Sequence, residues 1–440
     1  MTHASVLDEA SLHEAEPELR VQIVEIGFDT GTHETYQLVT SGAELDALAD
    51  PRHVRELVHM IRGGVTVQAK EGTVEFRALE GFAALGTELT EARRIMTEQS
   101  NTSIVFDEEL ILKVFRRLEA GVNPELELLR FLTERDFPNI AQLGGWYAYL
   151  GRPLDATLGV LQQYVRGALN GWELALDELE SEPERFLARL HRLGSVTGSM
   201  HAVLGSDAND PNFAPEEPSA ESLALLTATV DEEINRIFFE LPEDVEGLDP
   251  IRGRGEEVRE SLGLLTHAGS FGRVIRTHGD FHLGQTLWAE TLEEPAAEPP
   301  APGGRPRPPA AAGGDWVILD FEGEPVRSLP ERRRKRSPLR DVAGMLRSFA
   351  YAVSAVEILR GAAAPDGWEE RAREQFLVGY METVDQSLLP SGEAALERLL
   401  TVFELEKAVY ELRYELNNRP DWIHIPVAGI LRMLEAAATA

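Results

Sequence analysis

The segment RTHGDFHLGQTLW, Arg276–Trp288, places a carboxylate at Asp280 and a carboxamide five residues later at Gln285. Phosphoryl transfer from a nucleotide needs a base that orients a hydroxyl group, cations that neutralise the phosphates and donors that hold them. Asp280 has the chemistry of the base, and Gln285 offers the kind of oxygen ligand that Mg²⁺ accepts. Asp320, in the sequence DFEG, is a second candidate ligand of the metal ion.

The order of these residues matches two motifs of protein kinases. The motif H-R-D-x-x-x-x-N places the base Asp before an Asn that holds magnesium, and D-F-G supplies another metal-binding Asp. In this chain His278-Gly-Asp280 is followed by Gln285 at the same offset, and Gln keeps the carbonyl oxygen on a side chain longer by one methylene. Taken singly, each residue is explained as an ordinary polar loop group. Their joint occurrence predicts a kinase.

A lysine on an apolar strand is the candidate phosphate ligand. Lys113 lies in LILKVF, and a helix bearing Glu125 and Glu127 follows closely enough for one of these acids to pair with it. A lone strand lysine is more often a surface residue that extends its ammonium into water. The downstream motif is what favours the phosphate role.

Two further segments are candidates for nucleotide contacts. The turn EQSNTS lies where protein kinases have a glycine-rich loop, and its hydroxyl, carboxamide and backbone N–H groups suit phosphate oxygens, although a plain turn is the competing explanation. The end of the next buried strand fits an inter-lobe hinge whose backbone would hold adenine. The candidate residues are Ser100, Asn101, Thr102 and Ser103 in the turn, and Gln163, Tyr164 and Val165 in the hinge.

Strand and helix patterns position these groups. Alternating residues predict a hairpin from 21–27 and 34–39 after twenty disordered residues, a helix at 44–61, and further strands near 65–67 and 73–78. A second hairpin, 104–106 with 110–115, carries Lys113, and Asn123 followed by Pro124 predicts a helix N-terminus. A buried strand is expected at 158–165. Helical spacing dominates beyond Trp172, apart from residues 274–320.

The predicted fold class is α+β. We expect an α+β cap subdomain at 1–90, a kinase-like N-lobe at 91–165 and a mostly helical C-lobe at 166–440. Two short strands, 285–288 and 316–320, flank a Pro, Ala and Gly-rich insertion at 291–314 that is too poor in apolar residues to order itself.

Composition excludes several classes of protein. With no cysteine among 440 residues, thiolate metal sites, disulfides and iron–sulfur clusters are ruled out. The net charge of −33 repels nucleic acid and anionic membranes, and the chain has no apolar run of the roughly 18 residues that a membrane helix needs. The acidic start lacks the features of a signal peptide, so we expect a cytoplasmic protein. The basic stretch ERRRKRSPLR, 331–340, is a solvated loop or a phosphate contact.

Several motifs together resemble one family. The segments EQSNTS, ILKVFRRL, NPELE, HGDFHLGQTLW, ILDFEGEP, SPLRDVAGMLRSFAYA and YELRYELNNRPDWIHIP resemble the actinobacterial maltokinases, within the aminoglycoside-phosphotransferase-like and choline-kinase-like enzymes. The resemblance implies a bilobal eukaryotic-protein-kinase-like fold with an N-terminal cap and an all-α C-lobe. It also implies phosphorylation of maltose at its anomeric hydroxyl, with ATP and Mg²⁺, to give maltose 1-phosphate for α-glucan synthesis. Trehalose synthase is an implied partner, and we expect a monomer.

The resemblance also implies roles for single residues. Asp280 would be the base, Gln285 and Asp320 would bind magnesium, and Lys113 with Glu127 would anchor the phosphates. Glu127 is preferred to Glu125 because the family motif ends in that acid.

The same family takes its sugar contacts from the C-terminal helix. Lys407, Tyr410 and Tyr414 share a helix face, so their rings and polar groups suit a sugar, and Trp422 would close the pocket. An aromatic stripe packed into the core is the alternative for these aromatic residues. His282, two residues after the base, is a further candidate for contact with the acceptor sugar.

Other interpretations remain open. His278 and Asp341 are expected to support the catalytic loop rather than to react. The acidity of the chain also permits a kinase for another sugar, for an amino sugar such as glucosamine, or for an aminoglycoside, because fold does not determine substrate. Carboxylates rather than Lys407 in the acceptor site would favour the cationic acceptors. A pseudokinase or scaffold is disfavoured because Lys113, Asp280 and Asp320 are all present.

Overall fold

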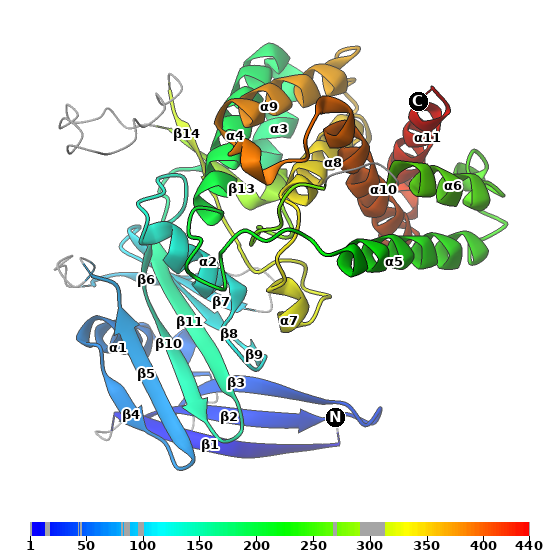
Figure 1. Ribbon diagram of the computed structural model, residues 1–440. Helices are drawn as coiled ribbons and strands as arrows, with labels where there is room; N and C mark the ends of the chain where they lie inside the picture. The colour runs from blue at the N-terminus through cyan, green and yellow to red at the C-terminus, as the bar shows by residue number, and fades with distance from the viewer. Residues whose placement is uncertain are drawn as a thin grey trace. The chain divides into compact units, whose positions relative to one another are not determined.

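A computed structural model of the chain divides into two compact units (Figure 1). The strand-rich unit comprises Met1–Ala168 and Leu319–Arg333, and the helical unit comprises Leu169–Ile318 and Arg334–Ala440. The residues described are 2–13, 18–42, 44, 46–80, 82, 89–95, 101–266, 271–290 and 313–439.

The strand-rich unit is built from short strands and a few helices. Its elements in chain order are β1 (His3–His13), β2 (Leu19–Gly27), β3 (His33–Ser41), η1 (Ala47–Ala49), α1 (Pro51–Gly63), β4 (Thr66–Gln68), β5 (Gly72–Ala78), β6 (Ala92–Arg94), β7 (Asn101–Phe106), β8 (Leu110–Phe115), β9 (Arg117–Leu118), α2 (Pro124–Thr133), β10 (Leu143–Gly151), β11 (Asp155–Gln163) and α7 (Leu329–Arg332).

Two antiparallel sheets organise this unit. One has the strand order β1-β2-β3-β9, and the other has the order β4-β5-β10-β11-β8-β7-β6. The helix α1 packs against β5 and β10, and α2 packs against β10. Both predicted hairpins are confirmed as β2–β3 and β7–β8. The sheet order puts β8, which carries Lys113, between β7 and β11 near the middle of the larger sheet.

The prediction that the first twenty residues are disordered is wrong. Residues His3–His13 form β1, which pairs along its length with β2 in antiparallel register. This strand has few large apolar residues. Its order comes instead from backbone hydrogen bonds to β2. The tyrosine hydroxyl of Tyr149 also donates to the Asp8 carboxylate, at 2.6 Å, and so ties the strand to the other sheet.

Capping residues decide where two helices begin. The side chain of Asn123 accepts a hydrogen bond from the Glu125 N–H at 2.8 Å, which confirms the predicted start of α2. The helix predicted at 44–61 is shorter at its N-terminal end, because Asp50 caps α1 and Pro51 occupies its first position. Residues 47–49 form a separate 3₁₀ turn.

The helical unit carries most of the long helices. Its elements are β12 (Leu169–Asn170), α3 (Gly171–Ser181), α4 (Pro183–Leu204), α5 (Ala220–Phe239), η3 (Glu246–Leu248), α6 (Gly255–Thr266), η4 (Leu283–Gln285), β13 (Thr286–Ala289), β14 (Asp315–Ile318), α8 (Leu339–Ala355), η5 (Val356–Arg360), α9 (Trp368–Thr383), η6 (Gln386–Leu388), α10 (Glu393–Asn418), η7 (Pro420–Trp422) and α11 (His424–Thr439).

The core of the helical unit includes a cluster of buried apolar residues from α5, α6, α10 and α11, among them Ile234, Leu262, Leu412 and Ile430. Helix α8 and the turn after it, Leu339–Arg360, are long and apolar enough to cross a membrane, judged by length and composition alone. However, 72% of their most apolar 18-residue stretch is buried inside the protein. Burial of this kind is typical of a core helix.

A small sheet holds the segment after the catalytic-loop motif. Its strand order is β12-β13-β14, and β13 pairs antiparallel with β14 as predicted. Most of the predicted flexible insertion at 291–314 lies outside the described residues. The α+β class is confirmed, whereas the three-part division at residues 90 and 165 stays a prediction.

Candidate active site

In the strand-rich unit, a lysine that is 12% exposed contacts three carboxylates. The Nζ atom of Lys113, on β8, lies 2.8 Å from Glu125 Oε2 and 2.6 Å from Asp320 Oδ1. It also forms an ion pair with Glu322. The Glu125 side chain, in the first turn of α2, is only 1% exposed. Residues far apart in the sequence therefore converge on one ammonium group.

The charge state of this cluster follows from its contacts. Burial by itself lowers the pKa of Lys113, but the carboxylates of Glu125, Asp320 and Glu322 outweigh it and hold that pKa well above its ordinary value. Burial also raises the pKa of Glu125, and the ammonium group opposes that rise. Lys113 is therefore charged at neutral pH, as a ligand of phosphate oxygens must be.

The expected partner of Lys113 was the wrong acid. The Oε1 and Oε2 atoms of Glu127 instead accept hydrogen bonds from Arg333, at 2.8 and 3.0 Å. The two acids lie two positions apart on α2, so they project from different sides of the helix. The rotation of α2 relative to β8 turns Glu125, and not Glu127, toward Lys113.

Asp320 combines an unusual backbone with an accessible carboxylate. Its φ is +60°, a region that residues other than glycine seldom occupy, and strain of this kind clusters at functional sites. Its side chain is 40% exposed, whereas the following Phe321 is fully buried and anchors the turn. Ligand atoms of Glu125, Asp320 and Glu322 lie within 4.8 Å of one another. The Lys113 ammonium already contacts all three carboxylates, and Asp320, the most exposed of them, has the oxygen that suits Mg²⁺ best.

The predicted phosphate-binding turn divides between the two faces of β7. Ser103 is paired with Lys113 in the register of β7 and β8, so the two side chains share a face. Asn101 lies on the same face and donates to Glu322 at 2.9 Å. The Thr102 hydroxyl points to the other face and accepts from Arg116 at 2.8 Å, away from Lys113. Ser100 lies outside the described residues.

The predicted hinge follows β11. The Tyr164 N–H donates to the Glu109 carbonyl at 2.7 Å, and its hydroxyl accepts from Arg93 at 3.0 Å. Gln163 is exposed and Val165 is half-buried. The tyrosine thus fixes the end of β11 to the turn between β7 and β8. Adenine binding by these three residues stays a prediction.

In the helical unit, the loop before Asp280 contains a residue in the left-handed backbone conformation. Gly279 has φ +88°, so a side chain at this position would be strained. The Asp280 N–H points to Nδ1 of the buried His278 at 3.4 Å. The glycine therefore allows the tight turn that presents the Asp280 carboxylate at the end of the loop.

Asp341, in the first turn of α8, braces this loop. Its carboxylate accepts hydrogen bonds from the His278 and Gly279 N–H groups, at 2.8 and 2.9 Å, and Nε2 of His201 lies at 3.2 Å. Burial by itself raises the pKa of Asp341, but the His201 hydrogen bond and the other contacts outweigh it and leave the pKa below its ordinary value. The predicted supporting roles of His278 and Asp341 agree with this geometry.

One face of α8 contacts the loop before and after Asp280. Asp341, Gly344 and Ser348 are spaced by three and four residues and so lie on the same side of the helix. A Cβ atom at Gly344 would come within 2.6 Å of the Phe281 carbonyl oxygen, and the Ser348 hydroxyl accepts from the Leu283 N–H at 3.3 Å. The close approach of this helix rigidly positions the segment that includes Asp280.

The residues after Asp280 form a short 3₁₀ turn. His282 caps that turn, since its Nδ1 accepts a hydrogen bond from the Gly284 N–H at 3.1 Å. The half-buried Gln285 ends the turn immediately before β13. Capping gives His282 a structural role, whereas contact with an acceptor stays a prediction.

Helix α10 brings the predicted acceptor residues into the helical unit. Lys407 Nζ lies 3.3 Å from Asp280 Oδ1 and 5.3 Å from the centroid of the Tyr410 ring. Tyr414 is 46% exposed, which suits a ligand contact. Trp422 is only 9% exposed and stacks on Tyr351, with the ring centroids 6.2 Å apart. Of this predicted set, Lys407 contacts the expected base directly, and Trp422 packs in the core.

A row of buried acids on α10 was not predicted from the sequence. Glu411 accepts from Arg347 at 2.6 Å, and Glu415 accepts from the Tyr351 hydroxyl at 3.0 Å and from Arg419 at 2.6 Å. Their spacing of four residues from Lys407 through Glu411 to Glu415 was visible as a common helix face. Glu322 was also missed, although it lies within the motif that contains Asp320.

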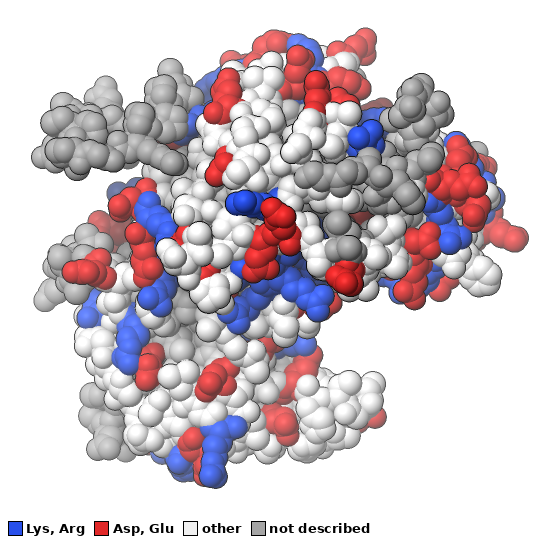
Figure 2. Space-filling model, viewed as in Figure 1, with Lys and Arg blue, Asp and Glu red and all other residues white. Residues whose placement is uncertain are grey.

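The basic stretch at 331–340 is paired with acids. Arg332 contacts Glu119, and Arg333 binds Glu127, both within the strand-rich unit. Figure 2 shows Lys and Arg side chains gathered where Figure 1 draws α7. These two arginines are therefore held by ion pairs within the fold, and the prediction of a solvated loop is wrong for them.

Comparison with known proteins identifies the class of fold. No family model matches the sequence. A solved structure of glucosamine kinase in complex with glucosamine, ADP and inorganic phosphate superimposes with a TM-score of 0.73 at 20% sequence identity, covering 99% of this chain and 94% of that one. The chain therefore has the protein-kinase-like fold that its motifs predicted.

Two proteins are similar to this chain in sequence as well as in length. The chain is 26% identical to glucosamine kinase of Streptacidiphilus jiangxiensis over 373 residues, which is 81% of this chain and 76% of the relative. It is 24% identical to glucosamine kinase of Mycolicibacterium smegmatis over 352 residues, which is 78% of this chain and 79% of the relative. Both of these relatives are named glucosamine kinases. They do not support a maltokinase.

The prediction that maltose is the acceptor is therefore wrong, because the relatives are glucosamine kinases. The motifs that suggested it include the phosphoryl-transfer residues, which do not determine the acceptor. A complex with trehalose synthase and a monomeric state stay predictions. The prediction of ATP and Mg²⁺ is confirmed by the kinase relatives, one of them solved with ADP.

Proposed function

We propose that the protein is a kinase that transfers a phosphoryl group from ATP to a hydroxyl group of glucosamine. The observation that carries this proposal is the similarity to glucosamine kinases along 81% of the chain. The net charge of −33 supports it, since a negative field attracts a protonated amine more than a neutral sugar. A cytoplasmic location is part of the proposal.

The residues of the helical unit would act on the acceptor. Asp280, held by the loop that Asp341 braces, orients the reacting hydroxyl and accepts its proton. Lys407, 3.3 Å from Asp280, limits the rotamers of that carboxylate. Tyr410 and Tyr414 offer rings against which the apolar face of a sugar can pack.

The residues of the strand-rich unit would act on the nucleotide. Lys113, kept charged by Glu125, binds phosphate oxygens. Asp320 would hold Mg²⁺, which supplies positive charge to the phosphates when bound. Gln285, the other predicted ligand of the ion, belongs to the helical unit. Asn101 and Ser103 share a face with Lys113 and can donate to the same phosphates.

The test is a coupled assay of ADP release with ATP and Mg²⁺ against glucosamine, glucose, maltose and kanamycin. We expect turnover with glucosamine and little with the other three. Turnover confined to kanamycin or glucose would overturn the acceptor while leaving the kinase in place, and no turnover with any acceptor would count against the enzyme.

A variant separates chemistry from binding. Asp280→Asn should lower kcat by roughly 10²–10⁴-fold, because it removes the base, while ATP binding is retained. Glu134→Gln is a matched control, since Glu134 is an exposed acid at the end of α2 that pairs with Arg130. Near wild-type turnover by Asp280→Asn would contradict the role of the base.

A further inference from the structure

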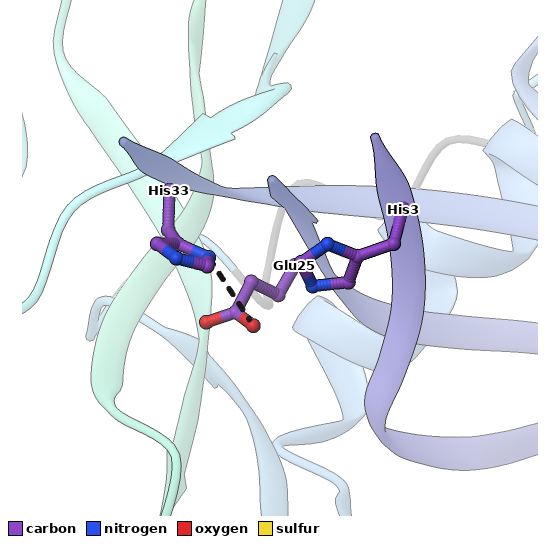
Figure 3. A group of neighbouring side chains, drawn as sticks. All are labelled: His3, Glu25 and His33. Carbon is purple, nitrogen blue, oxygen red and sulfur yellow. Dashed lines mark ion pairs between the residues drawn. The ribbon is translucent and has the colours of Figure 1, made fainter. Parts of the chain in front are cut away.

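Two histidines and a glutamate converge on one face of the first sheet (Figure 3). The three side chains come from three neighbouring strands: His3 from β1, Glu25 from β2 and His33 from β3. Figure 3 shows the Glu25 carboxylate between the two imidazoles. None of these residues has a part in the proposed phosphoryl transfer.

The strand register creates this convergence. His3 is opposite Gly27 on β2, and Gly27 is opposite His33 on β3, so the three form one row across the sheet. Opposed residues in antiparallel strands point to the same face, and Glu25, two residues before Gly27, shares that face. The backbone alone therefore directs all three side chains to one side.

Gly27 supplies the room for the His3 ring. A Cβ atom at position 27 would lie 2.4 Å from Cε1 and 2.6 Å from Nδ1 of His3, so any side chain there would displace the imidazole. With glycine, the ring lies over the central strand, and its centroid is 5.7 Å from that of His33. Thr2 fixes the start of β1 by donating its N–H to the Gly27 carbonyl at 2.8 Å.

The distances suit a shared cation. One ligand atom from each residue lies within 4.8 Å of the other two, and His33 Nδ1 is 3.7 Å from Glu25 Oε1. That separation is longer than a hydrogen bond, but two ligands of a tetrahedral Zn²⁺ ion lie roughly 3.4 Å apart. Small side-chain rotations are enough to bring the three donors to one ion.

The surroundings leave the donors accessible. The His33 side chain is 53% exposed and that of Glu25 is 33% exposed, so water can supply a fourth ligand. Within the described part of the chain, Glu25 pairs with no lysine or arginine that would compete for its carboxylate. Imidazole nitrogen with carboxylate oxygen is a donor set for Zn²⁺ and similar transition-metal ions rather than for Mg²⁺.

We propose that His3, Glu25 and His33 form a binding site for a divalent transition-metal ion, with Zn²⁺ as the cation of matching chemistry. The bound ion links β1, at the edge of its sheet, to β2 and β3. Because the metal binds the folded sheet and not the separated strands, it stabilises the strand-rich unit.

The test is a Zn²⁺ titration of the full-length protein by calorimetry after chelation and dialysis. Wild type should bind one Zn²⁺ ion at this site. His33→Ala and Glu25→Gln should each weaken that binding by at least about tenfold, since even the loss of a residue that only supports a ligand costs roughly 10–100-fold. His59→Ala, which removes an exposed histidine of α1, is the matched control and should bind as wild type does.

A second variant addresses the geometry. Gly27→Ala keeps all three donors but displaces the His3 ring, so it should also weaken Zn²⁺ binding. Unfolding temperatures in chelator establish that each variant is folded, and those of His33→Ala and Glu25→Gln should equal that of wild type. Equal Zn²⁺ affinity of His33→Ala, Glu25→Gln and wild type would overturn the proposal, whatever the enzyme's activity.

Discussion

The Asp341 carboxylate accepts a hydrogen bond of 2.9 Å from the backbone N–H of Gly279. Through this contact and the bond to His278, a residue on α8 determines the path of the loop that ends in Asp280. The side chain that would react is thus positioned by a carboxylate that is itself 2% exposed.

Asp341→Asn should lower the free energy of unfolding by about 1–3 kcal/mol at neutral pH, because the carboxamide has one acceptor oxygen for two backbone donors. The folded-state pKa of Asp341 is below the ordinary value of 3.8, so the ionised group stabilises the fold above that pH and the contribution is lost as pH falls through the folded-state pKa. Urea unfolding of both proteins at several pH values measures this. A difference that stays constant down to acid pH would contradict it.

Lys113→Met should destabilise the protein by about 3–5 kcal/mol, because it leaves the buried Glu125 without its counter-charge. Adding Glu125→Gln should recover part of that loss, which a double-mutant cycle of unfolding free energies measures. Lys70→Met, which removes an exposed lysine paired with Glu9, should cost less than about 1 kcal/mol. Full additivity of the first two changes would mean that the ion pair does not couple them.

Gly279→Ala should reduce both stability and turnover. The backbone φ of +88° disfavours any side chain, at a cost of about 1–3 kcal/mol, and relaxation of that strain would move Asp280. Gly263→Ala, in α6 with open space around the new methyl group, should instead stabilise by about 0.5–1 kcal/mol. Thermal unfolding and kcat measured on both variants test the contrast, and wild-type values for Gly279→Ala would contradict it.

Tyr414→Ala and Trp422→Ala should differ in kind. Tyr414 is 46% exposed, so its loss should change stability by less than about 1 kcal/mol and should raise KM for the acceptor with kcat largely kept. Trp422 is packed on Tyr351, so its loss should cost about 3–5 kcal/mol. Steady-state kinetics and unfolding curves measure both. An unchanged KM in Tyr414→Ala would remove this tyrosine from the acceptor site.

Local signals in the sequence predicted the local structure well. Asn123 with Pro124 located the start of α2, and the turn at 107–109 located the hairpin that carries Lys113. The strand β1 was missed because its residues alternate weakly, and its order depends on pairing with β2. Propensity describes the single segment, whereas pairing depends on a partner elsewhere in the chain.

The candidate site was predictable in its motif residues but not in their pairing. Asp280, Gln285 and Asp320 stand at offsets that a motif records. The choice of Glu125 over Glu127 depends on the phase of α2 relative to β8, which no spacing in the sequence records. The identity of the acceptor could not be predicted for a similar reason. Contacts to a sugar come from side chains that the phosphoryl-transfer motif does not contain.

The strand-rich unit is discontinuous in sequence, because Leu319–Arg333 returns to it after the whole of Leu169–Ile318. On a ribosome, Lys113 and Glu125 emerge long before Asp320 and Glu322, and at roughly 5–20 residues per second the delay is on the order of ten seconds. During that interval the nascent N-terminal part has its lysine and one acid only. Completion of the cluster is therefore a late step of biosynthesis, and truncated chains that end before Asp320 should differ from the finished protein in their resistance to proteases.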